Sequence, residues 1–401
     1  MSSLVDPPAA PQKPSSWKRR LKWVLVGLIV LVFIGAALVK DHVRTLASLR
    51  RLPGTNAFVM DYYVDYRLNE IRTHGVDVDD LEGSYIKALL PDVAVPIANR
   101  VKRAYLPNKI ETIQEFEPKR SQDDDHAREE PQALETTAEF EPGHRCSTVA
   151  IKSNSGQVFV GRNFDYHNDA FLILRVHDQN GLASITVIDL AYLNLNRADL
   201  EQTSLIERLP LLFAPYYLMD GMNRHGVAVM DMSVPHAEPP VTPGKPTIIQ
   251  STLMRIILDQ AESADEAVQL VQEFNVKFVE LPEHLMVADA AGRFRIIEFI
   301  DGKICVTSAS QNWQVCTNHV MWQKSEQEND ENCNRYRAGS HAAESVTGSV
   351  GFDDARDAIR TMAVDNWTMW TSVYDLTNRD IRVLYKSRLG SEYLDTLDNT
   401  H

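Results

Sequence analysis

The chain reads Cys146-Ser-Thr-Val-Ala-Ile-Lys-Ser-Asn-Ser-Gly-Gln-Val-Phe-Val-Gly-Arg-Asn-Phe-Asp-Tyr166 where its character changes from acidic and polar to strand-like. Two apolar, β-forming runs flank the turn signal Ser153-Asn-Ser-Gly156, which is typical of an antiparallel hairpin. In a hairpin, the start of the first strand lies beside the end of the second. We therefore expect Cys146 to lie close to Arg162 and Asp165.

These three residue types suit nucleophilic chemistry. A thiol attacks as thiolate, a neighbouring guanidinium lowers its pKa, and a carboxylate orients the proton acceptor. The alternative is that Cys146 is a small buried apolar residue and that Arg162 and Asp165 form a surface pair. The hairpin pattern alone leaves both interpretations open.

Downstream of the hairpin, strand and helix signals follow one another up to residue 385. Strands are predicted at 171–177, 182–188, 226–234, 284–289, 294–300, 303–308, up to 318, 368–376 and 381–385, and helices at 248–260, 263–274, 335–344 and 353–364. This pattern predicts an α+β fold with antiparallel strands. Layer packing favours two sheets face to face with helices outside, an αββα sandwich, although one sheet with helices on one face is also permitted.

Residues 1–40 have the composition of a membrane anchor. Trp23 to Val39 is an unbroken apolar run of 17 residues, preceded by four basic residues between 18 and 22. Such a run is at the short end of what crosses a bilayer, and its basic flank predicts a cytoplasmic N-terminus with the rest of the chain outside. A cleaved signal peptide is the alternative, although Ala36-Ala-Leu-Val39 is a poor cleavage site.

The segment between this run and Cys146 carries no recognisable chemistry. Residues 41–120 are mixed and are broken into short pieces by prolines, while residues 121–143 are acidic and poor in apolar side chains. The second stretch is typical of a solvated linker.

Composition excludes some classes of partner. The net charge of −14 argues against nucleic-acid binding, which calls for clustered Lys and Arg. Four cysteines at irregular spacing indicate neither a zinc site nor a disulfide scaffold, so we expect no metal and no cofactor. If the domain is exported, a pair among Cys305, Cys316 and Cys333 could oxidise.

The segment around Cys146 resembles the start of the mature chain in one group of N-terminal-nucleophile (Ntn) hydrolases, the choloylglycine hydrolases, penicillin V acylases and acid ceramidases. In that group Cys comes first, and Arg and Asp follow 16 and 19 positions later within a Gly-Arg-Asn-hydrophobic-Asp motif. Both spacings hold for Arg162 and Asp165. The similarity extends over most of residues 146–386 and implies a four-layer αββα sandwich with Cys146 as nucleophile.

Further motifs extend the resemblance. Val315-Cys-Thr-Asn318 is similar to the family element whose asparagine donates to the oxyanion, which implies that role for Asn318. The segment Asn334-Arg-Tyr-Arg337 resembles one that supplies a second active-site arginine, which implies Arg335, with Arg337 as the alternative. Alignment on the Gly226 element, Asp220-Gly-Met-Asn-Arg-His-Gly226, puts Ser233 where relatives have Asn or Tyr, so only its backbone N–H is a candidate second donor.

The 145 residues before the cysteine resemble the ceramidase-like arrangement, in which a prosegment is released by self-cleavage. The resemblance implies cleavage between Arg145 and Cys146, with the new α-amine as the base. It divides the chain into a cytoplasmic tip and transmembrane anchor at 1–40, a prosegment with an acidic linker at 41–145 and a catalytic domain at 146–401.

The implied activity is that of a cysteine amidase that hydrolyses a linear amide C–N bond through a thioester. An N-acyl amine, a ceramide-like amide or a conjugated bile acid is the expected kind of substrate, amphipathic because of the predicted anchor. An acyltransferase that uses the same thioester is one alternative, and a non-catalytic, membrane-tethered binding domain is another. A Cys-His thiol hydrolase would leave Arg162 and Asp165 unexplained.

Overall fold

The computed structural model describes residues 39–89, 146–166, 170–177, 181–346, 350–364, 366–386, 388 and 392–397. Within them, nine strands form one sheet in the order β1 (Arg50–Arg51), β2 (Ala57–Tyr62), β5 (Phe171–Val176), β6 (Ser184–Asp189), β7 (Asp220–Asn223), β8 (Ala228–Ser233), β11 (Glu283–Ala288), β12 (Phe294–Ile300) and β13 (Lys303–Ser308). All neighbours are antiparallel except β2 and β5, which are parallel.

A second sheet contains the predicted hairpin. Its order is β14 (Trp313–Cys316), β3 (Ser147–Lys152), β4 (Val158–Asp165), β15 (Thr368–Asp375), β16 (Asp380–Tyr385) and β17 (Glu392–Thr396), and every neighbouring pair is antiparallel. In the β3–β4 register Thr148 lies opposite Arg162. The hairpin prediction is therefore confirmed, and Cys146 directly precedes β3. The strands β9 (Thr247–Ile249) and β10 (Asn275–Lys277) form a separate, two-stranded parallel sheet.

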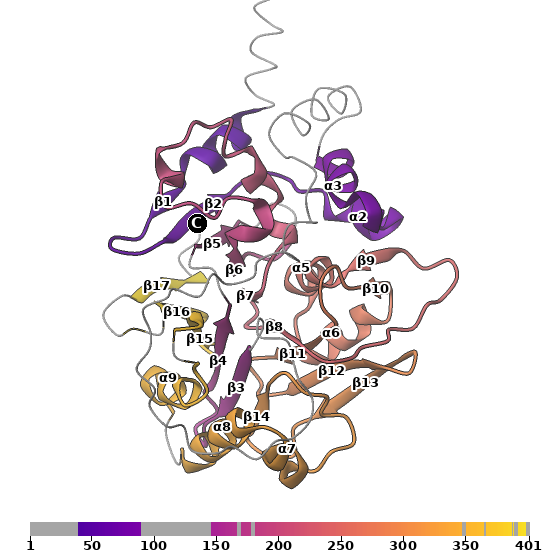
Figure 1. Ribbon diagram of the computed structural model, residues 1–401, viewed down its shortest axis with the longest axis vertical. Coiled ribbons are helices and arrows are strands. Elements are labelled where there is room, and N and C mark those ends of the chain that lie inside the picture. Colours follow the sequence, from indigo (N-terminus) through magenta and orange to yellow (C-terminus); the bar gives the residue numbers. More distant parts are fainter. Residues whose placement is uncertain are drawn as a thin grey trace, which may run out of the picture.

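The two sheets pack face to face, and helices cover their outer faces (Figure 1). Helices α5 (Gln250–Gln260) and α6 (Ala264–Val271) pack on the nine-stranded sheet, whereas α8 (Asn334–Ser345) and α9 (Phe352–Arg360) pack on the six-stranded sheet, next to α7 (Glu326–Asn332). The structure confirms the α+β class, and of the two predicted arrangements it has the one with stacked sheets.

The layers explain why the strands are so apolar. Along β8, Ala228, Met230 and Met232 face the six-stranded sheet, while Val229 faces the helices. Because both faces of this sheet are covered, apolar residues recur at every position and not at every second one.

The segment before the hairpin is part of the core. Residues 39–47 are helical, β1 and β2 extend the large sheet, and α2 (Leu68–His74) and α3 (Leu81–Leu89) follow. Short 3-10 helices occur at Val78–Asp80, Leu190–Leu193, Leu200–Gln202 and Leu209–Tyr216. Phe58 and Met60 of β2 are buried against the same core as α5. The sequence did not predict these strands, because their partner β5 lies more than 100 residues downstream.

The predicted single-pass membrane localisation is wrong for the part of the chain that the structure describes. No helix there is both long and apolar enough to cross a bilayer. Even α8 has only 12 residues, whereas a span needs about 20. The run of 23–39, on which the predicted anchor rested, lies outside the described residues except for its last position.

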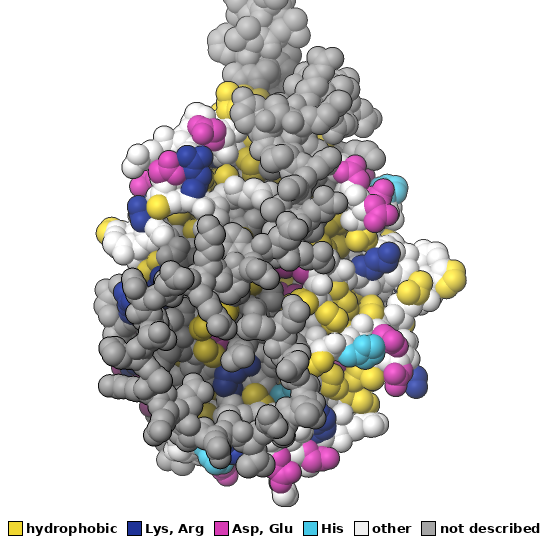
Figure 2. Space-filling model, in the orientation of Figure 1, with side chains coloured by type: hydrophobic (Ala, Val, Ile, Leu, Met, Phe, Trp, Pro, Cys, Tyr) yellow, Lys and Arg dark blue, Asp and Glu magenta, His cyan; other side chains and the backbone are white. Residues whose placement is uncertain are grey.

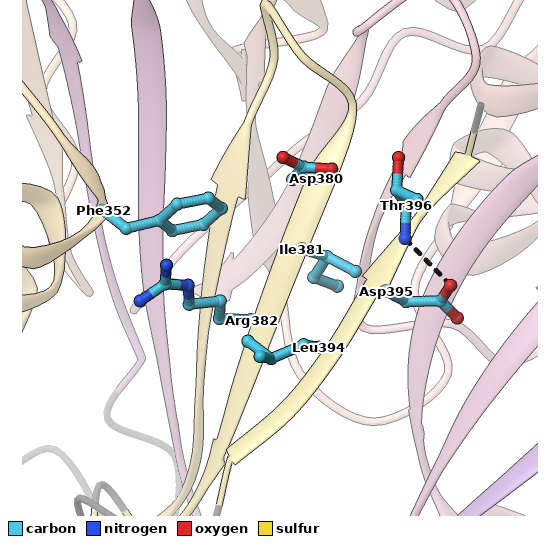
Figure 3. Close-up of a pocket in the computed structure, with 7 residues that line it drawn as sticks. All are labelled: Phe352, Asp380, Ile381, Arg382, Leu394, Asp395 and Thr396. Carbon is cyan, nitrogen blue, oxygen red and sulfur yellow. Dashed lines mark hydrogen bonds between the residues drawn. The ribbon is translucent and has the colours of Figure 1, made fainter. Parts of the chain in front are cut away.

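Charged side chains of both signs are interspersed on the visible, described part of the face in Figure 2. The hollow in Figure 3 lies on the side of α9, between that helix and strands β16 and β17. It is lined by Phe352, Asp380, Ile381, Arg382, Leu394, Asp395 and Thr396. Since none of these residues belongs to the predicted site, the hollow does not bear on it.

Candidate functional site

Cys146 lies between the two sheets, next to a buried arginine. Cys146 is 4% exposed, and the Arg162 Nη2 atom is 3.6 Å from its Sγ atom. Burial raises the pKa of the Cys146 thiol to about 12, since the opposing effect of Arg162 is weakened by Asp231 and Asp165. In the described structure this thiol is therefore protonated at neutral pH, and only a base would convert it to a thiolate.

Arg162 is fully buried and is held by two carboxylates from the opposite sheet. Its Nη1 donates to Asp220 Oδ2 at 2.8 Å, and its Nη2 donates to Asp231 Oδ1 at 2.5 Å and to the Asp231 carbonyl at 2.8 Å. Burial opposes its charge, but Cys146, Asp220 and Asp231 more than offset this and raise its pKa. The guanidinium is a fixed positive charge beside the thiol.

Asp220 is the acceptor for four donors. Besides Arg162, it accepts from Trp370 Nε1 at 3.0 Å, from Ser372 Oγ at 3.0 Å and from the Tyr374 hydroxyl. Three of these donors lie on β15, next to the hairpin strand β4. Asp220 of the large sheet thus ties the second sheet to Arg162.

Asp165 and Arg335 meet at the end of β4. The Asp165 Oδ1 atom accepts from Thr368 Oγ1 at 2.5 Å, and its Oδ2 atom is 3.7 Å from Arg335 Nη1. The same Nη1 donates to the Cys146 carbonyl at 2.9 Å. Arg335, in the first turn of α8, therefore contacts the residue that carries the thiol.

Asn318 follows β14 and faces the end of β8. Arg335 Nη2 donates to Asn318 Oδ1 at 2.7 Å, while Asn318 Nδ2 donates to the Ser233 carbonyl at 2.8 Å and is 3.2 Å from Ser233 Oγ. Because Arg335 occupies the oxygen, the NH2 group must point towards β8. The amide orientation that an oxyanion donor needs is thus imposed by a neighbouring charge.

The structure brings together Cys146, Arg162, Asp165, Ser233, Asn318 and Arg335, although they come from five separate segments. It separates the two arginine alternatives, since Arg337 is exposed and bonds to Asn334 at 2.5 Å. Arg145, on the amino side of the predicted cleavage bond, lies outside the described residues.

Sequence reasoning missed Asp220 and Asp231 as site residues. Both are carboxylates within strand patterns, at positions that apolar neighbours mark as buried. A buried acid inside a strand calls for a buried cation. The buried acids could therefore have indicated that Arg162 pairs with a carboxylate, although the sequence does not show which strand supplies that carboxylate.

A second thiol has a different character. Cys333 precedes α8, and Thr317 Oγ1 donates to its sulfur at 3.4 Å, while His319 Nδ1 is 2.9 Å from the same hydroxyl. Burial would raise the pKa of the Cys333 thiol, but hydrogen bonds from His319 and Thr317 dominate and lower it to about 6.

All four cysteines are free thiols. Among the described residues, no group of three acidic, His or Cys side chains could hold a metal ion.

Comparison with known proteins gives one family match. The model of the family described as acyl-coenzyme A:6-aminopenicillanic acid acyl-transferase matches residues 213–388. A penicillin V acylase from Pectobacterium atrosepticum is 33% identical over 113 residues. That stretch is 25% of this chain and 29% of the acylase, so this chain spans less than a third of the curated relative that it matches.

Solved structures of two enzymes are similar at low identity. A penicillin V acylase from Agrobacterium tumefaciens has a TM-score of 0.49 and 16% identity, over 63% of this chain and 87% of that one. A variant of a conjugated bile acid hydrolase from Clostridium perfringens has a TM-score of 0.47 and 12% identity, over 64% of this chain and 94% of that one. Scores below 0.5 are too low to carry an assignment.

The family match and the hairpin motif cover different parts of the site. The matched residues 213–388 include Asp220, Asp231, Asn318 and Arg335, while the Cys146 motif lies before them. Two separate parts of the chain thus indicate one relationship. The chain is thus similar to that acyl-transferase family over residues 213–388 and to a penicillin V acylase over 113 residues, which agrees with the predicted resemblance to Ntn hydrolases of the choloylglycine hydrolase and penicillin V acylase group.

Proposed function

We propose that this protein is a cysteine amidase that cleaves a linear amide C–N bond through a thioester on Cys146. The observation that carries the proposal is the convergence of a thiol, a buried guanidinium and an oriented amide donor, Asn318, at one end of the sandwich. Asn318 and Arg335 are partly exposed, so a substrate carbonyl can reach them from solvent.

The first step is self-cleavage before Cys146. The Cys146 sulfur forms a bond to the Arg145 carbonyl carbon, the C–N bond breaks, and the thiol proton passes to the leaving nitrogen, so that the acyl group moves from nitrogen to sulfur. Water then hydrolyses this thioester and releases a carboxylate on Arg145 and a free α-amine on Cys146. Such an amine has a pKa of about 7.7 to 8.0, which suits a base at neutral pH. It supplies what the protonated thiol of the uncut chain lacks.

Amide hydrolysis follows the same chemistry. The α-amine takes the thiol proton, the sulfur adds to the substrate carbonyl, and Asn318 Nδ2 with the backbone N–H of Ser233 donates to the oxyanion. The leaving amine departs with the proton, and water resolves the thioester. Arg162 stabilises negative charge on sulfur, and Arg335, which pairs with Asp165, holds the Cys146 carbonyl. Donors of this kind contribute a few kcal/mol to the transition state.

The proposed substrate is an N-acyl amine, a ceramide-like amide or a conjugated bile acid. Penicillin V and a conjugated bile acid, which the relatives' names indicate, are the first compounds to test. An acyltransferase is the second candidate, because the matched family model describes an acyl transfer. In that case an amine replaces water as the acceptor of the acyl group from the thioester.

The domain boundary follows from the same cleavage, with a leading segment at 41–145 and a catalytic chain at 146–401. The six-residue register between β2 and β5 and the burial of Phe58 and Met60 support continued association of the two pieces after the cut. Residues 39–89 would then act as a bound subunit and not as a released prosegment. Copurification of both fragments after cleavage checks this, and loss of the leading fragment on a sizing column would contradict it.

The test of the function starts with the purified full chain and its Cys146→Ala variant. Fragment masses and N-terminal sequencing report cleavage, and release of free amine from the substrate panel reports amidase activity. Cys305→Ala, which removes another buried thiol, is the matched control. We expect a new N-terminus at Cys146 and amide cleavage in the parent and in the control, and neither in Cys146→Ala. An uncut, inactive parent would overturn the proposal in favour of a non-catalytic binding domain.

A further inference from the structure

A buried pair of ionisable side chains lies between the sheets and has no part in the chemistry above. His284 on β11 and Glu298 on β12 are 1% and 2% exposed, and His284 Nδ1 is 3.3 Å from Glu298 Oε1. Burial opposes the ionisation of Glu298, but hydrogen bonds from His284 and from the Met321 backbone lower its pKa. Ionisable side chains are costly to bury in a core, so the position of this pair calls for a structural reason.

The proton positions of His284 follow from its partners. Its Nε2 atom is 2.8 Å from the Thr317 carbonyl oxygen, which can only accept. Nε2 therefore carries a hydrogen and donates it across the gap between the two sheets. Glu298 contacts the other ring nitrogen and so fixes the ring in the orientation that reaches Thr317.

The His284–Glu298 pair also contacts the backbone that follows Asn318. The Glu298 Oε1 atom also accepts from the Met321 backbone N–H at 2.8 Å. Thr317 and Met321 flank Asn318, whose own side chain bridges Arg335 and Ser233. The segment that carries the oxyanion donor leaves its strand at Cys316 and is attached to the opposite sheet on both sides.

We propose that His284 and Glu298 are positioning residues, which hold residues 317–321 so that the Asn318 amide stays at the distance an oxyanion requires. This inference rests on the proposed amidase function. His284 Nε2 also lies 3.3 Å from the sulfur of Cys316 in the core, but the inference goes beyond sheet packing because the bonds to Thr317 and Met321 end on backbone atoms of the catalytic segment. A displacement of about 1 Å in a catalytic group can lower a rate by about 100-fold.

Two substitutions at His284 separate the roles of its ring nitrogens. In His284→Gln the amide nitrogen can take the place of Nε2 and donate to Thr317. In His284→Asn the shorter side chain can still contact Glu298 but does not reach Thr317. Leu285→Ala is the control, since Leu285 lies on the same strand but faces the helices. Glu298→Gln is the second test if the His284 variants do not fold, because it loses the charge that orients the ring.

For each variant, kcat and KM are measured on the processed enzyme, together with hydrogen–deuterium exchange of the peptide that covers 317–322. We expect His284→Asn to lower kcat by about 10- to 100-fold with KM within about twofold, and to accelerate exchange of that peptide. His284→Gln should keep kcat within about threefold of the parent, and Glu298→Gln should resemble His284→Asn in direction. Leu285→Ala should leave kcat and this exchange unchanged.

Equal kcat values for His284→Asn and His284→Gln would overturn the proposal, as would an equal loss in Leu285→Ala. A parent that cleaves no amide refutes the proposed function separately. The exchange comparison then decides the positioning claim by itself: unchanged exchange in His284→Asn overturns it, and faster exchange confined to 317–322 supports it.

Discussion

Replacement of Asp220 tests how the two sheets are held around Arg162. The carboxylate is fully buried and accepts from Arg162, Trp370, Ser372 and Tyr374. An alanine would leave those donors without this acceptor and Arg162 with Asp231 as its remaining carboxylate. Removal of one partner of a buried pair costs about 3 to 5 kcal/mol. We expect Asp220→Ala at the upper end of that range. Asp220→Asn should lie near the lower end, because its amide oxygen still accepts.

The assay is urea unfolding, followed by tryptophan fluorescence and circular dichroism, in the Cys146→Ala background, which removes the thiol required for the proposed self-cleavage. Asp199→Asn, in an exposed pair with Arg197, is the control and should leave the unfolding midpoint unchanged. A loss below about 1 kcal/mol for Asp220→Ala would match an exposed ion pair and would refute the idea that this carboxylate holds the sheets together.

Three further outcomes are expected. Asn318→Ala should lower kcat on the best amide by about 100- to 1,000-fold with intact folding, and a kcat within about twofold of the parent would exclude it as oxyanion donor. Burial raises the pKa of Asp231 from its ordinary value of 3.8 to about 6, so the folded chain binds a proton that the unfolded chain has released. The free energy of unfolding should therefore fall as pH rises from about 4 to about 6, and urea titrations of Asp231→Asn should show a flatter profile. In the uncut chain at pH 7, iodoacetamide should label Cys333 before Cys146, because their thiol pKa values are about 6 and about 12, and peptide mass mapping would detect the reverse order.

Local patterns in the chain predicted much of the fold. The alternation around Ser153-Asn-Ser-Gly156 predicted the β3–β4 hairpin, and with it the approach of Arg162 to Cys146, because strand pairing across a short turn depends on neighbouring residues only. Helices α5, α6, α8 and α9 were predicted within a few residues of their bounds for the same reason. The motif spacing, through the family resemblance, also indicated Asn318 and Arg335.

Contacts between distant segments could not be read in this way. The pattern of apolar side chains in residues 57–62 does not indicate that this strand pairs with β5, more than 100 residues away. It also does not indicate that the leading segment belongs to the core. The membrane prediction rested on the apolar run of 23–39 and its basic flank, and no helix of the described structure supports it.

The identity of the predicted nucleophile, its hairpin and its motif partners came from the sequence, because each depends on residues that are close along the chain or on spacing within a motif. Tertiary structure alone selected Asp220 and Asp231 as the partners of Arg162, Arg335 over Arg337 as the contact of Asn318, and His284 with Glu298 beneath Thr317. The physical reason is that buried charges are satisfied by whichever side chains the stacking of two sheets brings within hydrogen-bond distance, and no local pattern encodes that stacking.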